Sequence, residues 1–258
     1  MSLVIEKRNN ILEIRFNRPE VHNAFNDEVI EQVINIFENI DETIRLVVIS
    51  AEGKSFCAGA DLNWMKSMKE YSMEQNIADS QQLNKMFSAI DNCSCPVLGK
   101  VHGHALGGGV GVVAVCDFVL ASSKAKFGFT EVRLGLIPAV ISPYCIKKIG
   151  ISNARAHFLS GAVFTAQTAK EMGLVHEVVE SEELDSRFTE IVTSYLQAGP
   201  QAARDSKELI KSVSDIPEEQ VSDYTTEFIA RKRISEEGQE GMSALLEKRK
   251  ANWVLDDK

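Results

Sequence analysis

The hydrophobic positions change their period within the first fifty residues. Residues 2–19 alternate apolar and polar positions on both sides of Asn9-Asn10, which predicts two short strands joined by a tight turn. Apolar residues then recur at helical spacing over residues 26–42, and Asn26 is suited to cap that helix. Residues 45–51 form a continuous apolar run rich in β-branched side chains, which predicts a buried strand.

The alternation of strands and helices continues to about residue 122. The pattern predicts a loop, a helix, a buried strand and a further strand, at residues 52–62, 72–90, 95–103 and 117–122. Between the last two strands it predicts a glycine cluster followed by a short apolar helix. Strand–helix–strand order is typical of parallel βαβ units. We therefore expect an α/β core.

The pattern changes after Pro138. It predicts two helices and a short strand, at residues 151–161, 165–173 and 174–179. From about Glu182 the pattern is helical, with breaks at Gly199-Pro200 and Pro217 and a final amphipathic helix over residues 240–253. We expect a core domain at residues 1–198 and a helical C-terminal region at residues 199–258.

Composition narrows the class of protein. The 258 residues carry a net charge of -9, which argues against nucleic acid as a partner. No apolar segment approaches the roughly 20 residues that span a bilayer, and the N-terminus lacks the pattern of a signal peptide. The 5 cysteines are irregularly spaced, which argues against a disulfide framework. We expect a cytoplasmic protein.

The glycine cluster at Gly107–Gly109 and Gly111 matches no nucleotide-binding motif. Val112 stands where a dinucleotide fingerprint needs glycine, and no Gly-Lys-Ser/Thr follows. His102 and His104 fit either two metal ligands or side chains that flank a strand end. No zinc-binding spacing accompanies them, so we expect no metal.

Two loops share a composition of small residues followed by a helix. Residues 57–61 and 106–111 both follow predicted strands, where ligands bind in open α/β sheets. Such loops can aim backbone N–H groups at one oxygen and form an oxyanion hole, or they can serve only close packing. Glu131, among apolar residues and glycines, fits either a general acid/base or a surface glutamate.

Three segments together resemble the crotonase (enoyl-CoA hydratase/isomerase) superfamily: "SFCAGADL", "HGHALGGGVGVVAVCDFVLAS" and "FGFTEVRLGLIP". The likeness extends through "NRPEVHNAFN", "TAQTAKEMGLVHEVV" and "EGMSALLEKRKANW". It implies a core of repeated ββα units, a helical C-terminal region that forms a homotrimer or a dimer of trimers, and acyl-CoA thioester substrates. It implies no cofactor besides the CoA of the substrate.

The resemblance also assigns roles to single residues. The oxyanion hole would consist of the N–H groups of Ala60 and Gly108, with Gly107 permitting the approach and Glu131 transferring the proton. CoA would contact several further positions, namely Val21, Ala58, Ala60, Asp61, Leu62 and Lys248. Lys248 also fits a solvated helix face.

Gly111 departs from the pattern of many family hydratases, which hold one water between two glutamates twenty residues apart. Glu131 matches the second glutamate, and Gly111 stands at the position of the first. A single carboxylate suffices for an isomerase that moves a proton between C2 and C4. Simple two-glutamate hydration is therefore in doubt.

Other residues resemble bacterial methylglutaconyl-CoA hydratases of leucine degradation, whose substrate is branched and carries a distal carboxylate. On this hypothesis Gly111 leaves volume beside the acyl chain, and polar groups near Ala139 meet the carboxylate: Arg133, Ser142 or Tyr144. Arg133 fits a surface ion pair equally well. Three hypotheses about the function follow. The protein is a hydratase of a short, branched or carboxylated 2-enoyl-CoA, a Δ3-Δ2-enoyl-CoA isomerase, or a non-catalytic CoA- or RNA-binding scaffold.

Overall fold

The computed structural model describes residues 1–254 and divides into two compact units within the chain. The first unit comprises Met1–Cys93 and Val97–Phe188, and the second comprises Ser94–Pro96 and the chain from Thr189 onward. We expected the domain boundary between residues 198 and 199, whereas the two units divide between Phe188 and Thr189. Each unit is described by itself.

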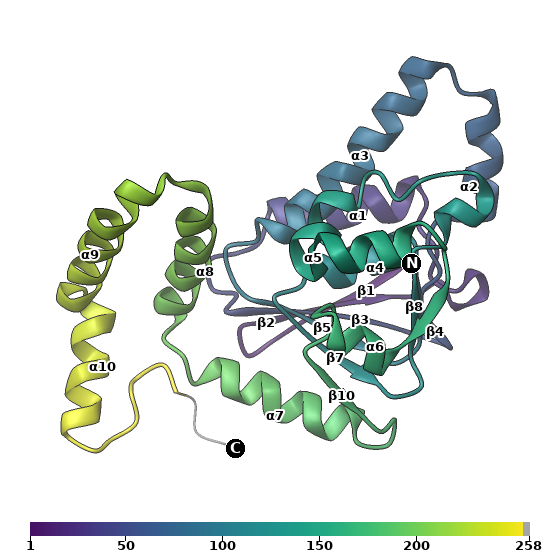
Figure 1. Ribbon diagram of the computed structural model, residues 1–258. Coiled ribbons are helices and arrows are strands. Elements are labelled where there is room, and N and C mark those ends of the chain that lie inside the picture. Colours follow the sequence, from purple (N-terminus) through teal and green to yellow (C-terminus); the bar gives the residue numbers. More distant parts are fainter. Residues whose placement is uncertain (255–258) are drawn as a thin grey trace. The chain divides into compact units, whose positions relative to one another are not determined.

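A six-stranded sheet forms the centre of the first unit (Figure 1). Its order is β1-β2-β3-β5-β7-β10, and every pair is parallel except the β1–β2 hairpin. Positive φ angles at Asn9 and Asn10 form the expected tight turn of that hairpin. The α/β prediction is confirmed. The strands are Leu3–Arg8, Ile11–Phe16, Leu46–Ala51, Val97–Val101, Phe118–Ser122 and Glu177–Val179.

A second sheet of three-residue strands was not predicted from the sequence. Its order is β4-β6-β8-β9, and β4 lies within the segment 52–62 that we expected to be a loop. Ala105, Phe127 and Phe164 lie side by side in its register and are buried, so one face packs on the core. The strands are Ser55–Cys57, His104–Leu106, Lys126–Gly128 and Val163–Thr165.

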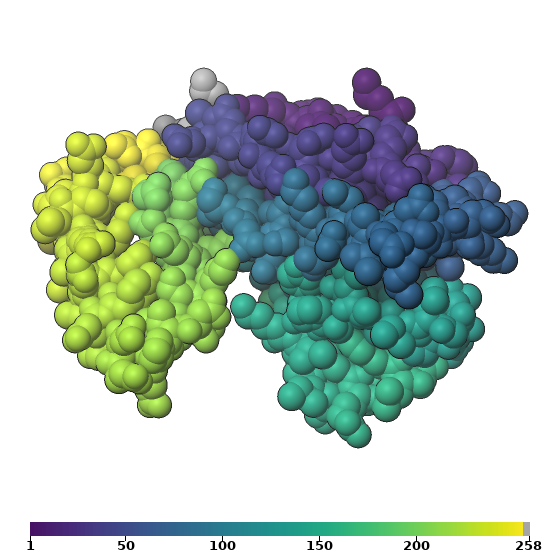
Figure 2. Space-filling model, turned by 90° about the horizontal axis from the view of Figure 1, so that it is seen from above, coloured from purple at the N-terminus to yellow at the C-terminus, as the bar shows by residue number. Residues whose placement is uncertain are grey.

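The helices of the first unit pack in pairs around these sheets. α1 contacts α3, α3 contacts α4, and α4 contacts α5. Figure 2 shows α1 and α3 side by side on one face of this unit, in purple-blue and blue. α5 begins earlier than predicted, at Ser142. The helices are α1 (Asp27–Glu38), α2 (Leu62–Ser67), α3 (Met73–Asp91), α4 (Gly108–Val115), α5 (Ser142–Phe158) and α6 (Ala166–Glu171), with short 3₁₀ helices η1 (Pro19–Val21), η2 (Met68–Glu70) and η3 (Thr130–Leu134).

The second unit is helical, as expected. It contains the end of α7 (Leu184–Leu196), α8 (Pro200–Asp215), α9 (Glu218–Ile234) and α10 (Glu236–Leu246). The predicted final helix over 240–253 is wrong in its second half, because α10 ends at Leu246 and Lys248 has a left-handed φ of 55°. Large apolar side chains stay exposed on this unit, among them Ile210, Ile234, Leu245 and Leu246. No described helix is both long enough and apolar enough to cross a membrane.

Candidate active site

The loop after β4 presents the N–H group of Ala60. Gly59 has a φ of +94°, a conformation that glycine adopts without strain. Its carbonyl accepts a hydrogen bond of 2.7 Å from the N–H of Phe25, and the N–H of Asp61 donates to the carbonyl of Phe25 at 2.8 Å. In a planar trans peptide the C=O and N–H groups point in opposite directions. The Ala60 N–H is therefore aimed away from Phe25, and it has no hydrogen-bond partner within residues 1–254.

The glycine cluster presents a second N–H group, that of Gly108. Gly107 has a φ of +51°, and its N–H donates to the carbonyl of Gly128 at 2.9 Å. Its carbonyl accepts from Val110 at 2.9 Å, which fixes the peptide between Gly107 and Gly108. Gly108 is the first residue of α4, where the N–H has no acceptor inside the helix. Both loops follow strands, but these are the short strands β4 and β6 and not the predicted strands at 45–51 and 95–103.

The two loops and Glu131 meet at Gly107. A Cβ at Gly59 would lie 3.8 Å from the nitrogen of Gly108. A Cβ at Gly107 would lie 3.8 Å from the Cα of Gly59 and 3.2 Å from Oε1 of Glu131. Any side chain at Gly107 would fill the space between donors and carboxylate. The structure thus brings together the three groups that the sequence analysis had singled out.

The Glu131 carboxyl group lies in surroundings that raise its pKa. η3 carries it, and the N–H of Leu136 donates to its carbonyl at 3.1 Å. Its Oε2 atom is buried and has no hydrogen-bond partner in the part of the chain that the structure describes. Burial raises the pKa of Glu131, and its own backbone N–H acts in the opposite sense. A carboxyl group with a raised pKa and a free oxygen can both accept and return a proton near neutral pH.

The close packing of α4 explains another glycine of the cluster. A Cβ at Gly109 would lie 2.4 Å from the carbonyl oxygen of Cys57, so only glycine permits this approach of α4 to β4. Cys57 itself is fully buried, and burial raises the pKa of its thiol to about 12. The thiol is therefore no thiolate nucleophile at neutral pH. Cys57 is a packing residue.

Gly111 does not leave free volume, which corrects the expectation from the sequence. A Cβ there would lie 2.5 Å from Cγ2 of Ile141 and 2.8 Å from the ring of Phe87. Both side chains are buried, so the space in front of Gly111 is filled by hydrocarbon. The position of the first glutamate of the two-glutamate pattern is closed, and its surroundings are apolar.

Most of the CoA-binding candidates lie around the Ala60 loop, but not all offer a free N–H. Val21 is half-buried in η1, and Leu62 is exposed at the first position of α2. The N–H of Ala58 donates to the carbonyl of His22 at 3.0 Å, and that of Asp61 is used by Phe25. Among Ala58, Ala60 and Asp61, only the Ala60 N–H has no acceptor within residues 1–254. Lys248 belongs to the other unit, where it follows α10.

The candidates for contact with a distal carboxylate have different neighbours. The side chain of Arg133 is exposed and lies against Gly161, with its Cγ 3.0 Å from a Cβ there. Tyr144 packs near Phe87 and donates its hydroxyl to Asn84 on α3 at 3.3 Å. Ser142 donates its hydroxyl to the carbonyl of the exposed Ala139 at 2.7 Å.

Sequence reasoning missed the side chains that support the site. Phe87 and Ile141 close the space at Gly111, and Arg18 forms an ion pair of 2.8 Å with Asp61. Only the buried pair carried a sequence signal: an arginine just before a proline and an aspartate directly before a helix, where it caps the N-terminus. No local sequence pattern indicated that Arg18 and Asp61 pair with each other.

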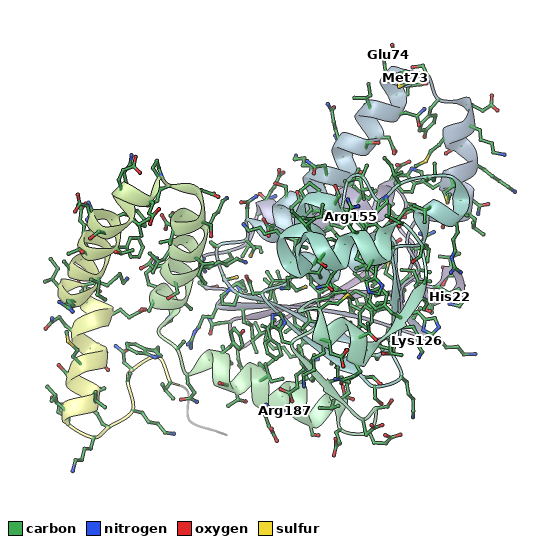
Figure 3. The ribbon with its side chains drawn as sticks, viewed as in Figure 1. His22, Met73, Glu74, Lys126, Arg155 and Arg187 are labelled. Atoms are coloured by element: carbon green, nitrogen blue, oxygen red, sulfur yellow. The ribbon has the colours of Figure 1, made fainter. Side chains whose placement is uncertain are left out.

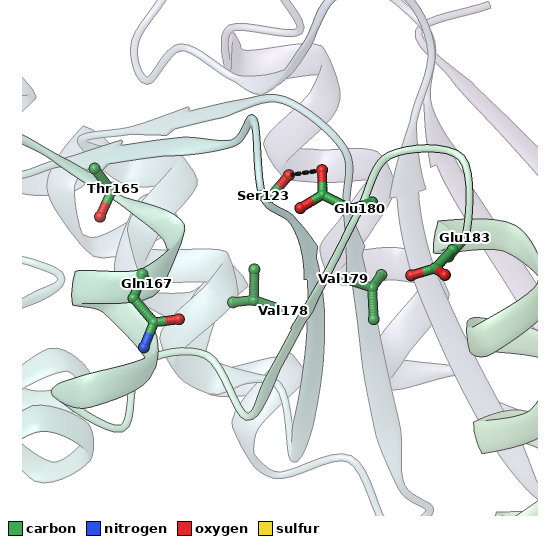
Figure 4. A pocket seen from close by; sticks show the side chains of 7 residues that line it. All are labelled: Ser123, Thr165, Gln167, Val178, Val179, Glu180 and Glu183. Carbon is green, nitrogen blue, oxygen red and sulfur yellow. Dashed lines mark hydrogen bonds between the residues drawn. The ribbon is translucent and has the colours of Figure 1, made fainter.

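A separate hollow of about 510 Å³ lies beside β10 and α6 (Figure 4). Ser123 donates to Glu180 at 2.8 Å there, and none of the candidate site residues lines it.

Within residues 1–254, no group of three or more His, Cys, Asp or Glu side chains is placed to hold a metal ion. His102 contacts the carbonyl of Gly53 at 3.0 Å instead.

Comparison with known proteins agrees with this geometry. Residues 6–255 match the family described as "Enoyl-CoA hydratase/isomerase". The chain is 30% identical to a crotonyl-CoA hydratase of Syntrophomonas wolfei, covering 98% of both chains, and 31% identical to a 2,3-dehydroadipyl-CoA hydratase of Escherichia coli, covering 96% of both. A solved enoyl-CoA hydratase of Shewanella pealeana superposes with a TM-score of 0.93 at 36% identity, over 98% of this chain and 96% of that one.

The chain therefore belongs to the enoyl-CoA hydratase/isomerase family, with the crotonase fold. It is an enzyme of that family, and the family implies an acyl-CoA substrate.

The filled space at Gly111 yields a stability prediction. Gly111→Ala forces a methyl group against Ile141 and Phe87, and overpacking of a buried site typically costs about 1–3 kcal/mol. We expect the double variant with Ile141→Ala to be less destabilised than the sum of the two single variants, because removing Cγ2 of Ile141 makes room for the methyl group. Urea unfolding of the four proteins measures this coupling. Strict additivity would contradict the packing described.

Proposed function

We propose that the protein hydrates a 2-enoyl-CoA, with Glu131 as the general acid/base and the N–H groups of Ala60 and Gly108 as the oxyanion hole. The observation that carries the proposal is the meeting of the two donor loops and the Glu131 carboxylate at Gly107. Negative charge develops on the thioester oxygen when C2 or C3 reacts, and fixed N–H donors stabilise it. Removing one such donor typically costs about 2.7–4 kcal/mol of barrier.

The proposed reaction needs one carboxylate. Ionised Glu131 accepts a proton from water while the water oxygen bonds to C3, and the electrons of the C2–C3 double bond move to the carbonyl oxygen as an enolate. Glu131 then returns the proton to C2, and the enolate collapses to the thioester. The sum is one water added across the double bond. The unpartnered Oε2 of Glu131 supports this role, because a water can hydrogen-bond to it.

The relatives support hydration and leave room for a carboxylated substrate. The Syntrophomonas relative is a crotonyl-CoA hydratase, and the Escherichia coli relative acts on 2,3-dehydroadipyl-CoA, whose acyl chain ends in a carboxylate. We propose a short, branched or carboxylated acyl group of the methylglutaconyl-CoA type, which would place the enzyme in leucine degradation. The polar side chains of Arg133, Ser142 and Tyr144 are the candidate partners of the carboxylate.

A second candidate function is isomerisation between Δ3- and Δ2-enoyl-CoA. The apolar contacts that close the position of Gly111 favour it, since a second carboxylate is absent there and Glu131 alone can move a proton between C2 and C4. The two reactions differ in mass, because hydration adds the mass of one water and isomerisation adds none. A non-catalytic scaffold would give neither product.

We propose, further, that the helical C-terminal region assembles the chain into a homotrimer or a dimer of trimers in the cytoplasm. The exposure of large apolar side chains there supports an interface, since Leu245 and Leu246 are 79% and 82% exposed. Apolar patches of this kind commonly mark contacts with another protein. Lys248 follows α10 in this region, and we propose that it contacts the CoA phosphates.

Glu131→Gln tests the proton-transfer role. We expect the rate of hydration or isomerisation of crotonyl-CoA and 3-methylglutaconyl-CoA to fall by about 10²–10⁴-fold, because the amide cannot accept the proton. Liquid chromatography with mass spectrometry separates the two isomers and the hydrated product, and so measures the rate of each reaction. Full activity of the variant on every enoyl-CoA would exclude both.

The dependence of kcat/KM on pH tests the role of Glu131 in the unmodified enzyme. A general base must be ionised, so kcat/KM should fall as the pH drops through the pKa of Glu131, and the raised pKa places that fall above the usual range of a glutamate. A profile that stays flat down to the ordinary pKa of about 4.3 would contradict the assignment.

Arg133→Met tests the carboxylated substrate. We expect kcat/KM for 3-methylglutaconyl-CoA to fall by about tenfold, the loss of one charged hydrogen bond of roughly 1.5 kcal/mol, while kcat/KM for crotonyl-CoA stays unchanged. Tyr144→Phe tests a second candidate partner with the same two substrates. Equal effects of Arg133→Met on both substrates would count against recognition of the carboxylate by this side chain.

A further inference from the structure

A buried polar network lies behind the loop that carries Ala60. Nη2 of Arg18 donates to Oδ2 of Asp61 at 2.8 Å, and Nη1 donates to the carbonyl of Ala24 at 2.7 Å. Asp61 is 4% exposed, and its other oxygen accepts from the N–H of Asn63 at 2.8 Å at the start of α2. One guanidinium therefore ties the residue after Ala60 to the residue before Phe25.

Asn23 anchors the same arginine from its other side. Its Oδ1 accepts from the N–H of Arg18 at 2.8 Å, and its Nδ2 donates to the carbonyls of Glu52 and Ser55, each at 2.8 Å. Asn23 is 2% exposed and has a left-handed φ of 57°. The network thus connects the segment after β2 with the beginning of β4.

The network surrounds the peptide that presents the Ala60 N–H. That peptide is held through Gly59 by Phe25, and Phe25 in turn accepts from Asp61. Arg18 donates hydrogen bonds to the residues next to Phe25 and Ala60, namely Ala24 and Asp61. If Arg18 is lost, the segment that carries Phe25 and the loop that carries Ala60 lose their side-chain bridge at Asp61. The remaining side-chain bridges, from His22 and Asn23, reach only Glu52 and Ser55 near the beginning of β4, so the Ala60 N–H is held less firmly.

The bridge also neutralises a charge. Burial acts to raise the pKa of Asp61, yet hydrogen bonds from the backbone of Asn63 and from Arg18 outweigh it, so the pKa lies below its usual range. A carboxylate held ionised one residue from an oxyanion donor repels the enolate unless its charge is balanced. The Arg18 guanidinium balances it.

We propose that Arg18 and Asp61 are positioning residues for the oxyanion hole: their ion pair, between a half-buried arginine and a buried aspartate, fixes the direction of the Ala60 N–H and offsets the carboxylate charge beside it. Neither residue touches the reacting atoms. This inference rests on the proposed function of Ala60 as a donor to the thioester oxygen.

The competing interpretation is that Asp61 only caps α2, since its side chain accepts from the N–H groups of Asn63 and Trp64. Asp61→Asn separates the two roles, because asparagine is an N-cap of similar quality but cannot pair with a guanidinium as an anion. Arg18→Met removes the bridge, and Arg18→Lys keeps the charge without the fork that reaches two acceptors.

The experiment compares these three variants with the parent by steady-state kinetics and by infrared spectroscopy of bound crotonyl-CoA labelled with ¹³C at the carbonyl. The matched control is Arg187→Met. It breaks the ion pair between Nε of Arg187, on α7, and Oε1 of Glu177, on β10, which lie 2.6 Å apart. Figure 3 places Arg187 on α7, away from His22 beside the Ala60 loop. Circular dichroism and thermal unfolding establish that each variant is folded.

We expect kcat to fall by about 10–10²-fold in Arg18→Met and Asp61→Asn, the scale of a misplaced catalytic group, while KM changes by less than about threefold because the CoA contacts remain. The carbonyl band should shift toward that of crotonyl-CoA in water, with Arg18→Lys intermediate and Arg187→Met unchanged.

The inference is overturned if folded Arg18→Met and Asp61→Asn keep the parent's kcat and carbonyl frequency. It is also overturned if all three variants fail to fold, since the network would then serve stability alone. A parent enzyme that hydrates or isomerises no enoyl-CoA would instead contradict the proposed function, and the carbonyl frequency of bound crotonyl-CoA would still decide the positioning role.

Discussion

The close approach of two backbone segments at Gly59 and Gly107 is the constraint on which the site depends. Two loops can present N–H groups to one oxygen only if no side chain stands between them, and both glycines have positive φ angles that suit them to the sharp turns involved. The same contact brings Glu131 within reach of Gly107. Donors and carboxylate therefore share one small space.

The surrounding fold holds this contact in place. β4 and β6 are neighbours in the small sheet, so the loops that follow them leave from adjacent strands. α4 starts directly at Gly108 and packs against Cys57 through Gly109, which ties the second loop to the end of β4. The buried pair of Arg18 and Asp61 fixes the other side of the first loop. Groups that are held from several sides stay close to the geometry that a reaction needs.

The sequence predicted the features that depend on local pattern. The β1–β2 hairpin, α1, α3 and the central parallel strands follow from hydrophobic periodicity over at least five residues. The donor loops and Glu131 were identified because small residues and an isolated carboxylate stood at strand ends. The small sheet was missed because strands of three residues show no measurable alternation, and their pairing joins segments that are far apart in the chain.

The role of Gly111 shows why the rest required the structure. From the sequence it was an absent glutamate with free volume in front of it. The volume is filled by Phe87 and Ile141, which lie on separate segments more than twenty residues away from it in the chain. The bridge between Arg18 and Asp61 likewise spans 43 positions. No local pattern encodes such contacts.

The central claim is that this site forms an enolate of an acyl-CoA with Glu131 as the base, and solvent exchange tests it most directly. Butyryl-CoA has no double bond to hydrate, so its only route to exchange is removal and return of a proton at C2. In D₂O the account predicts that the enzyme introduces deuterium at C2 and that Glu131→Gln does not, as read by mass spectrometry. Exchange at the same rate in both proteins, or none in a parent enzyme that turns over enoyl-CoA, would contradict it.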